Sequence, residues 1–200
     1  MKDRPTLDVS HLPPYAFGHR SLLWWGTMGM IAIEGMVFAL GIAAYFYLRN
    51  RSALWPPGGP PPALFYGTLN TVIMLISVIP NAWLKRRAEK EDLRAVQIGL
   101  VICLVLSIVF LVIRVYEFKT LNCKWDTNAY GSAVWSLLGF HTVHLLTDTL
   151  DTVVITVLMF TSLVEGKRFV DVSEYCFYWY FVVLSWVPIY AVIYLAPRLL

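Results

Sequence analysis

The chain has few charged residues. Asp, Glu, Lys and Arg make up 14% of its 200 residues, and 58% are apolar. A typical soluble domain carries about 25% charged residues, and a soluble protein of this size could not bury so much apolar surface. The composition therefore predicts an integral membrane protein. The net charge of +3 is small, and the basic residues lie in loops between apolar runs. This pattern indicates a membrane surface rather than nucleic acid as a partner.

Motifs of soluble enzymes are also missing. The sequence has no Walker A motif, no G-x-G-x-x-G, no G-x-S-x-G and no C-x-x-C-H, so the usual nucleotide, hydrolase and haem-attachment sites are excluded. Cys103, Cys123 and Cys176 form no C-x-x-C, and we expect neither a disulfide nor a thiolate metal site. The first 20 residues hold no apolar core, so we expect no cleavable signal peptide there, and we expect the first membrane helix to direct targeting.

Five long apolar stretches predict an all-α integral membrane bundle of five transmembrane helices. A polar arm, residues 1–21, precedes a single domain, residues 22–200. The loops and ends on one side of the predicted membrane hold ten Lys and Arg, against five on the other. The positive-inside rule then places the N-terminus in the cytoplasm and the C-terminus in the periplasm. The predicted helices span residues 22–48, 64–84, 95–118, 129–164 and 175–196.

The fourth apolar stretch carries a polar stripe. On a helix, His141, His144, Asp148 and Asp151 fall within an arc of about 80°. Ionisable groups at membrane depth face protein rather than lipid. Glu34 lies in the middle of the first predicted helix and must be protonated or hydrogen-bonded to a buried partner. We interpret these five residues as a buried polar joint between the first and fourth helices or as a proton relay, and the sequence leaves both alternatives open.

The stripe also raises the question of a metal site. Di-metal bundles take carboxylate and histidine ligands from several helices, whereas here a single helix offers such a set. Haem needs axial ligands on opposite faces, and His141 and His144 on adjacent turns of one helix cannot supply both. We therefore expect no metal site and no catalytic residue in this chain.

Polar pairs occur in two other predicted helices. Asn70 and Thr71 do not titrate, so we interpret them as groups that hold neighbouring helices together. Arg114 and Glu117 are three residues apart and can pair on one face of the third helix. Alternatively, Arg114 can extend its side chain to the membrane interface.

Several motifs are similar to those of one known family. They read, in order, WWGTMGMIAIEGMVFALGIAAYFYLR, LNTVIMLIS, YEFKTL, DTNAYGSAVWSLLGFHTVH and YWYFVVLSWVPIYAVIY. Together they resemble subunit III of the haem-copper terminal oxidases, which comprise the cytochrome c and quinol oxidases. The residues that carry the resemblance include Glu34, Asn70, Thr71, Glu117, Tyr130, Gly131, Ser132, His141, His144, Trp179 and Trp186.

The chain also departs from the family pattern. It looks like the five-helix form, because seven-helix members carry two further helices before these five. Arg114 stands where the family has a glutamine, and Tyr180 and Val183 replace a histidine and an aspartate. Asp148 and Asp151 are additional to the common pattern.

The resemblance implies a non-catalytic accessory subunit of a proton-pumping oxygen reductase, which supports the stability and proton uptake of the catalytic subunit. Haem and copper are then expected in the partner subunits, subunits I and II, and phospholipid is a candidate ligand of this chain. A bacterial cytoplasmic membrane and a larger respiratory supercomplex are the expected setting.

Three rival functions stay open at this stage. One is the related subunit of nitric oxide reductase. Another is a proton-coupled transporter that uses Glu34, His141 and Asp148 as its relay, and the third is a small metalloenzyme of the bilayer.

Overall fold

The computed structural model describes residues 16–57, 59–161 and 166–199, and within these ranges the regular structure is entirely helical. A short 3-10 turn, η1 (Gly18–Arg20), precedes the first long helix. The five helices long and apolar enough to cross a membrane are α1 (Leu22–Asn50), α2 (Leu64–Ala88), α3 (Leu93–Lys119), α4 (Ala129–Phe160) and α5 (Gly166–Tyr190), which continues through the π segment η2 (Ala191–Leu195) into α6 (Ala196–Leu199). The predicted all-α bundle of five membrane helices is confirmed.

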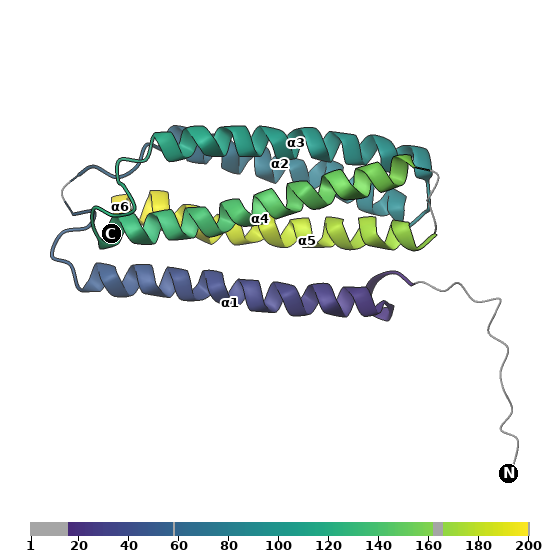
Figure 1. Ribbon diagram of the computed structural model, residues 1–200. Helices are drawn as coiled ribbons and strands as arrows, with labels where there is room; N and C mark the ends of the chain where they lie inside the picture. Colours follow the sequence, from purple (N-terminus) through teal and green to yellow (C-terminus); the bar gives the residue numbers. More distant parts are fainter. Residues whose placement is uncertain (1–15, 58, 162–165, 200) are drawn as a thin grey trace, which may run out of the picture.

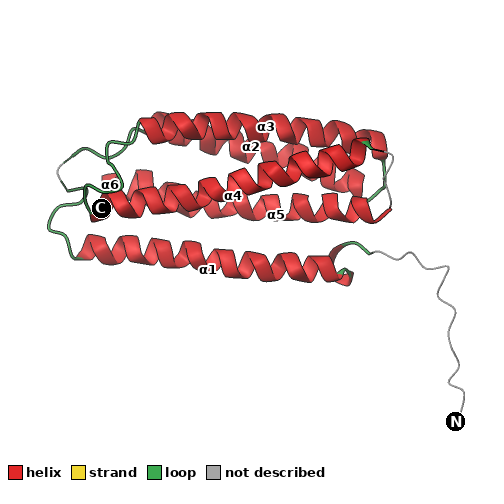
Figure 2. Cartoon of the chain, in the orientation of Figure 1, coloured by secondary structure: helices red, strands yellow, loops and turns green. Residues whose placement is uncertain are grey.

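Figure 1 shows the long helices side by side in one bundle. α2 and α3 run along one edge, α4 and α5 occupy the middle, and α1 lies along the opposite edge. The contacts agree with this view, because α1 packs against α4 and α5, while α2 packs against α3 and α5. The loops that join the helices gather at the two ends of the bundle, as Figure 2 shows. α1 is therefore a peripheral helix.

Three of the long helices begin at a side-chain cap. Ser21, Asp92 and Asn128 adopt extended backbone conformations, and each accepts a hydrogen bond from an amide two or three residues later. Such caps satisfy N–H groups that have no partner within the helix. The start of α2 follows a proline-rich loop instead, at residues 51–63. Side-chain caps therefore help to set the first residues of α1, α3 and α4.

The start of α5 differs from the prediction. The sequence predicts a loop over residues 165–174, whereas the helix begins at Gly166. An ion pair of 3.2 Å between Arg168 and Asp171, three residues apart, supports this first turn, and Phe169 is buried against the neighbouring helices. The charges in this segment therefore belong to a helix face rather than to a loop.

The other predicted helices agree with the structure to within a few residues at each end. α1, α2 and α3 extend slightly further than predicted. The last residues of the predicted fourth helix, 162–164, and residues 1–15 of the predicted arm lie outside the described residues.

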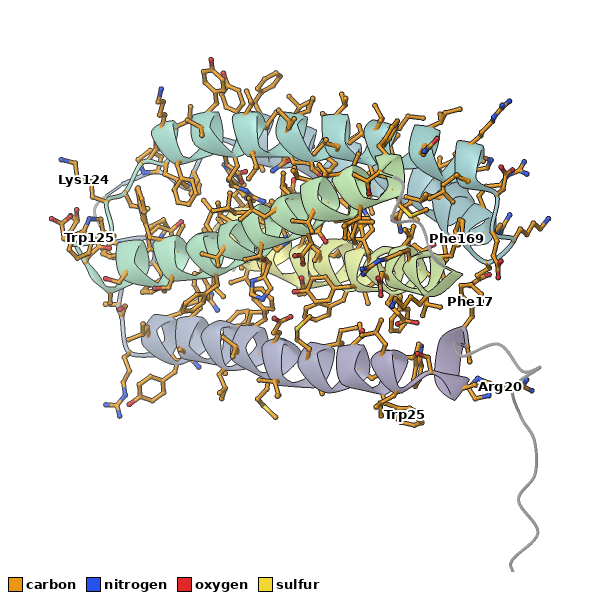
Figure 3. All side chains as sticks on the ribbon, turned by 45° about the vertical axis from the view of Figure 1, so that its right-hand side comes forward. Phe17, Arg20, Trp25, Lys124, Trp125 and Phe169 are labelled. Atoms are coloured by element: carbon orange, nitrogen blue, oxygen red, sulfur yellow. The ribbon has the colours of Figure 1, made fainter. Side chains whose placement is uncertain are left out.

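Two apolar clusters fill the bundle, one towards each end. Phe110 and Trp179 stack at 5.5 Å in the larger cluster. The smaller cluster contains Phe169, with Phe17 packed against it. Figure 3 shows these two phenylalanines at the end of the bundle where α1 begins, and Lys124 at the other end. We call these ends the N-terminal end and the C-terminal end of the bundle.

Substitution of Gly131 tests the packing at the start of α4. An added Cβ at Gly131 would lie 2.1 Å from the backbone oxygen of Lys124, which the chain cannot move without rebuilding the loop. We expect Gly131→Ala to destabilise the protein by about 1–3 kcal/mol. Gly139→Ala, where a Cβ meets no atom within 4 Å, is the matched control and should be neutral. Thermal unfolding in mild detergent measures both, and equal midpoints would contradict the described packing.

Candidate functional site

A buried ion pair lies inside the bundle. The guanidinium Nη1 of Arg114 is 2.9 Å from the Oε2 atom of Glu117, and each side chain is 1% exposed. The two residues are one helical turn apart on α3, so the predicted pair is confirmed. The alternative, in which Arg114 reaches the membrane interface, is wrong, because the Glu117 carboxylate and its neighbours hold the guanidinium inside.

The carboxylate of Glu117 accepts hydrogen bonds from three helical segments. Tyr194 of η2 donates its hydroxyl proton to Oε1 at 2.5 Å, and the Asn70 amide of α2 donates to Oε2 at 3.4 Å. Arg114 completes the set from α3. Several donors at one buried carboxylate offset part of its desolvation and join the segments that supply them.

Arg114 also contacts two rings. Its Nη2 atom lies 3.1 Å from the Nδ1 atom of His141, and the guanidinium carbon lies 4.1 Å from the ring centroid of Trp186. The Nε2 atom of His141 lies 3.0 Å from the carbonyl oxygen of Val182. Because a carbonyl can only accept and an arginine can only donate, Nε2 carries the proton and Nδ1 accepts. His141 is thus a neutral imidazole with both nitrogens engaged.

The contacts around Arg114 extend to α2 through Trp186 of α5. The indole Nε1 donates to Thr71 Oγ1 at 2.7 Å, and Thr71 in turn donates to the carbonyl of Gly67. Asn70 and Thr71, interpreted from the sequence as interhelical contacts, therefore bond to side chains of other helices. We call Arg114, Glu117, His141, Trp186 and Tyr194 the central cluster.

Glu34 belongs to a second, separate group. Tyr178 of α5 donates its hydroxyl proton to Oε2 at 2.7 Å, and the Nε2 atom of His144 on α4 lies 3.6 Å from Oε1. The Nδ1 atom of His144 lies 2.6 Å from the carbonyl of Phe140 and so carries a proton. The side chains of Glu34 and His144 keep exposed fractions of 25% and 15%. This triad joins α1 to α4 and α5 at a partly open position.

The predicted polar joint of five residues is therefore divided. Glu34 and His144 do meet between α1 and α4, whereas His141 faces α3 and α5 in the central cluster. Asp148 is buried at 1% exposure, neither of its carboxylate oxygens has a hydrogen-bond partner among the described residues, and Asp151 is exposed. α4 has neighbours on several sides. Residues of α4 that lie within one arc of about 80° can therefore contact different helices.

Family-motif residues at the start of α4 stabilise the C-terminal end. The Ser132 hydroxyl donates to the carbonyl of Trp125 at 2.7 Å. Tyr130 is buried, and its ring centroid lies 5.1 Å from that of Trp55 in the proline-rich loop. Gly131, which lies between Tyr130 and Ser132 in the sequence, approaches the backbone oxygen of Lys124 closely. These residues connect loops rather than form a reactive site.

Trp179 makes a second tryptophan hydrogen bond between α5 and α2, besides that of Trp186. Its indole Nε1 donates to Ser77 Oγ at 3.0 Å, while its ring stacks on Phe110 of α3. A buried tryptophan of this kind supplies both apolar area and a directed hydrogen bond.

The histidines and acids of the described helices are spread through the bundle. Among the described residues, no three His, Cys, Asp or Glu side chains converge on a point where a metal ion could bind. Both ring nitrogens of His141 are engaged, so haem ligation there would break its bond with Arg114 or with the Val182 carbonyl. Hence the described arrangement joins helices through directed hydrogen bonds.

The chain matches the family model for cytochrome c oxidase subunit III over residues 15–197. It belongs to the cytochrome c oxidase subunit III family. The resemblance inferred from motif order is confirmed.

Three relatives support the assignment, and two of them are matched over most of their own length. Cytochrome c oxidase subunit 3 of Thermostichus vulcanus is 27% identical, over 92% of each chain. The subunit 3 of Corynebacterium diphtheriae is 26% identical, over 84% of this chain and 85% of that one. A protein of Aeropyrum pernix named heme-copper oxidase subunit I+III is 24% identical, over 94% of this chain and 24% of its own length.

Sequence reasoning assigned no role to two tyrosines that complete the polar groups of this subunit III chain. Tyr178 bonds Glu34, and Tyr194 bonds Glu117. A usable signal was present, because tyrosine hydroxyls inside an apolar helix need hydrogen-bond partners and buried carboxylates need donors. The sequence does not show which tyrosine meets which carboxylate, since that depends on how α5 packs.

Substitutions of the buried ion pair test the central cluster. We expect Arg114→Gln or Glu117→Gln alone to cost about 3–5 kcal/mol, because each leaves a buried charge without its partner. The double variant should cost less than the sum of the two. Arg168→Gln, which breaks a half-exposed pair, should cost about 1 kcal/mol or less. Unfolding midpoints of the four variants measure the coupling, and additive effects at Arg114 and Glu117 would contradict it.

Proposed function

We propose that this chain is subunit III of a bacterial proton-pumping haem-copper oxygen reductase, in complex with subunits I and II. The family match across nearly the whole chain is the observation that carries the proposal. As a member of this family, the chain is an accessory subunit of a haem-copper oxidase. Its role is to support the stability and sustained proton uptake of the catalytic subunit.

The described polar groups agree with an accessory role. In the central cluster, one carboxylate and one guanidinium connect α2, α3, α4 and the end of α5. Such a group stabilises a bundle without any redox chemistry. Haem and copper are accordingly assigned to the partner subunits, and phospholipid is the ligand proposed for this chain.

The rival transporter is not favoured by the geometry. Its relay would need Glu34, His141 and Asp148 in sequence. Glu34 instead bonds Tyr178 and contacts His144, while His141 bonds Arg114 and Val182. The carboxylate of Asp148 has no hydrogen-bond partner in the part of the chain that the structure describes.

The relatives also favour an oxygen reductase over nitric oxide reductase, since they carry the names cytochrome c oxidase subunit 3 and heme-copper oxidase. The name of the Aeropyrum pernix protein, subunit I+III, supports subunit I as a direct partner. A larger respiratory supercomplex is the wider assembly that we propose.

Purification of the tagged chain from membranes in mild detergent tests this function. We expect subunits I and II to co-purify, with haem and copper in the complex and with oxygen rather than nitric oxide as the substrate reduced. Isolation of the chain without any haem-copper partner would overturn the proposal.

Glu34→Ala should weaken assembly or sustained turnover without changing the metal content of the complex. The substitution removes the acceptor of Tyr178 and the partner of His144, so we expect a fall of about twofold or more in assembled complex or in activity half-life. Asp126→Ala, in an exposed loop, is the control. Haem and copper assays of the purified complex decide the matter, and metal loss from an assembled Glu34→Ala complex would contradict a non-redox role.

The proposed location is the bacterial cytoplasmic membrane, with the N-terminus in the cytoplasm. The basic end of α2, at Lys85, Arg86 and Arg87, lies at the N-terminal end of the bundle, which supports that end as the cytoplasmic one. Alkaline phosphatase fused after Leu200 should then be active, whereas a fusion after Lys90 should be inactive. Green fluorescent protein at the same points should give the inverse pattern, and the opposite result at both points would reverse the orientation.

A further inference from the structure

A small cavity lies inside the bundle, between α2, α3 and α5. It offers about 10 Å³ to the centre of a water-sized sphere, which is roughly the space that one water molecule needs. Polar side chains from all three helices line it, namely Ser77 and Asn81 of α2, Ser107 of α3 and Tyr175 of α5. The residues of the central cluster do not line this cavity, so it is a separate polar feature of the interior.

Asn81 has an acceptor that is not used. Its Nδ2 atom donates to the backbone carbonyl of Cys176 on α5 at 2.9 Å. A carbonyl can only accept, so this bond fixes which end of the amide is the nitrogen. The Oδ1 atom is therefore an acceptor, and it is buried without a hydrogen-bond partner among the described residues. Asn81 is 1% exposed, so a donor for this oxygen has to come from inside the bundle.

The depth of Asn81 in the membrane makes such an oxygen costly. Asn81 lies about 10 Å along the helix from Ala88, the last residue of α2. α2 is about 37 Å long, whereas the hydrocarbon layer of a bilayer is about 30 Å thick, so Asn81 lies within that layer. An unpaired polar group in these surroundings costs more than one near bulk water. A partner for Oδ1 is therefore strongly favoured.

Two serine hydroxyls of the cavity can make further hydrogen bonds. Ser77 donates to the carbonyl of Met74 at 2.6 Å and accepts from the Nε1 atom of Trp179 at 3.0 Å, which leaves one lone pair free. Ser107 is 3% exposed, and its hydroxyl can both donate and accept. Together with Asn81 they supply the roughly two to four polar partners that a buried water molecule requires.

The small cavity lies close to a route from the surface. Tyr175 lines it and also lines a larger cavity of about 260 Å³ between α1, α4 and α5. The larger cavity reaches the surface of the bundle, because Asp151 on its wall is exposed. The Tyr175 hydroxyl lies 2.9 Å from Thr152 Oγ1 on α4, and this hydrogen bond holds the ring between the two cavities.

We propose that the small cavity is a binding site for a single water molecule, which donates to Asn81 Oδ1 and links α2 to α3 through the Ser107 hydroxyl. The volume excludes a larger ligand. The wall contains no histidine, lysine, arginine or carboxylate side chain, which favours a neutral ligand over an ion. The water enters past Tyr175, and its hydrogen bonds replace a direct bond between the two helices.

Substitutions at Asn81 and Ser107 test the site in the full chain. Ser107→Val removes a hydroxyl and fills the cavity, so Asn81 Oδ1 loses its donor. We expect the thermal unfolding midpoint in mild detergent to fall by about 2–8 °C. In an Asn81→Leu background no acceptor is left to satisfy, so the same change should be nearly neutral or should raise the midpoint. Absence of the fall, or an equal fall in both backgrounds, would overturn the proposal.

Ser185→Val is the matched control. Ser185 is buried on α5, and its hydroxyl already donates to the carbonyl of Val182 at 3.0 Å. Its effect on the midpoint should be the same with and without Asn81→Leu. A coupling of Ser185→Val to Asn81→Leu as large as that of Ser107→Val would also contradict the water site.

A cryo-electron microscopy map of the wild-type chain in its native complex tests the site directly. At a resolution that shows ordered water, we expect one density peak about 3 Å from both Asn81 Oδ1 and Ser107 Oγ. A map that shows water elsewhere in the interior but none at this position would overturn the proposal. Should the variants fail to accumulate, this map decides, because it needs no substitution.

Discussion

An ion pair with almost no exposure to water lies between Arg114 and Glu117, and the packing of four of the five long helices is arranged around it. Removing two charges from water is expensive, and hydrogen bonds to the pair offset part of that cost. Tyr194, Asn70 and His141 supply such bonds from three other segments, while the buried Nε atom of Arg114 has no partner among the described residues. The interior is thus specified by directed bonds, which lipid-like apolar side chains alone cannot provide in a membrane.

Much of the fold could be predicted from the sequence. Helices in a bilayer must satisfy their own backbone groups, so apolar length and basic loops reveal the crossings directly. The start of α5 was missed because the charges near Arg168 resemble a loop when the tertiary contacts of Phe169 are unknown. Periodicity placed His141 and His144 on one face of α4, but their separate partners depend on how far α4 rotates against its neighbours.

The two polar groups differ in their access to the surroundings. The central cluster is enclosed by α2, α3, α4 and α5, whereas the Glu34 triad lies under a single peripheral helix. The chain thus combines an enclosed interior with a peripheral helix whose polar contacts stay partly exposed. Asp148 belongs to neither group, and its buried carboxylate oxygens have no hydrogen-bond partner within residues 16–57, 59–161 and 166–199.

The fixed tautomer of His141 has a consequence for the helices that it joins. Adding a proton to that ring would break its bond with Arg114, since Nδ1 would then face a donor that cannot accept. The neutral ring thus links α3 to α5 across α4 in one orientation only, because its donor and its acceptor cannot be exchanged.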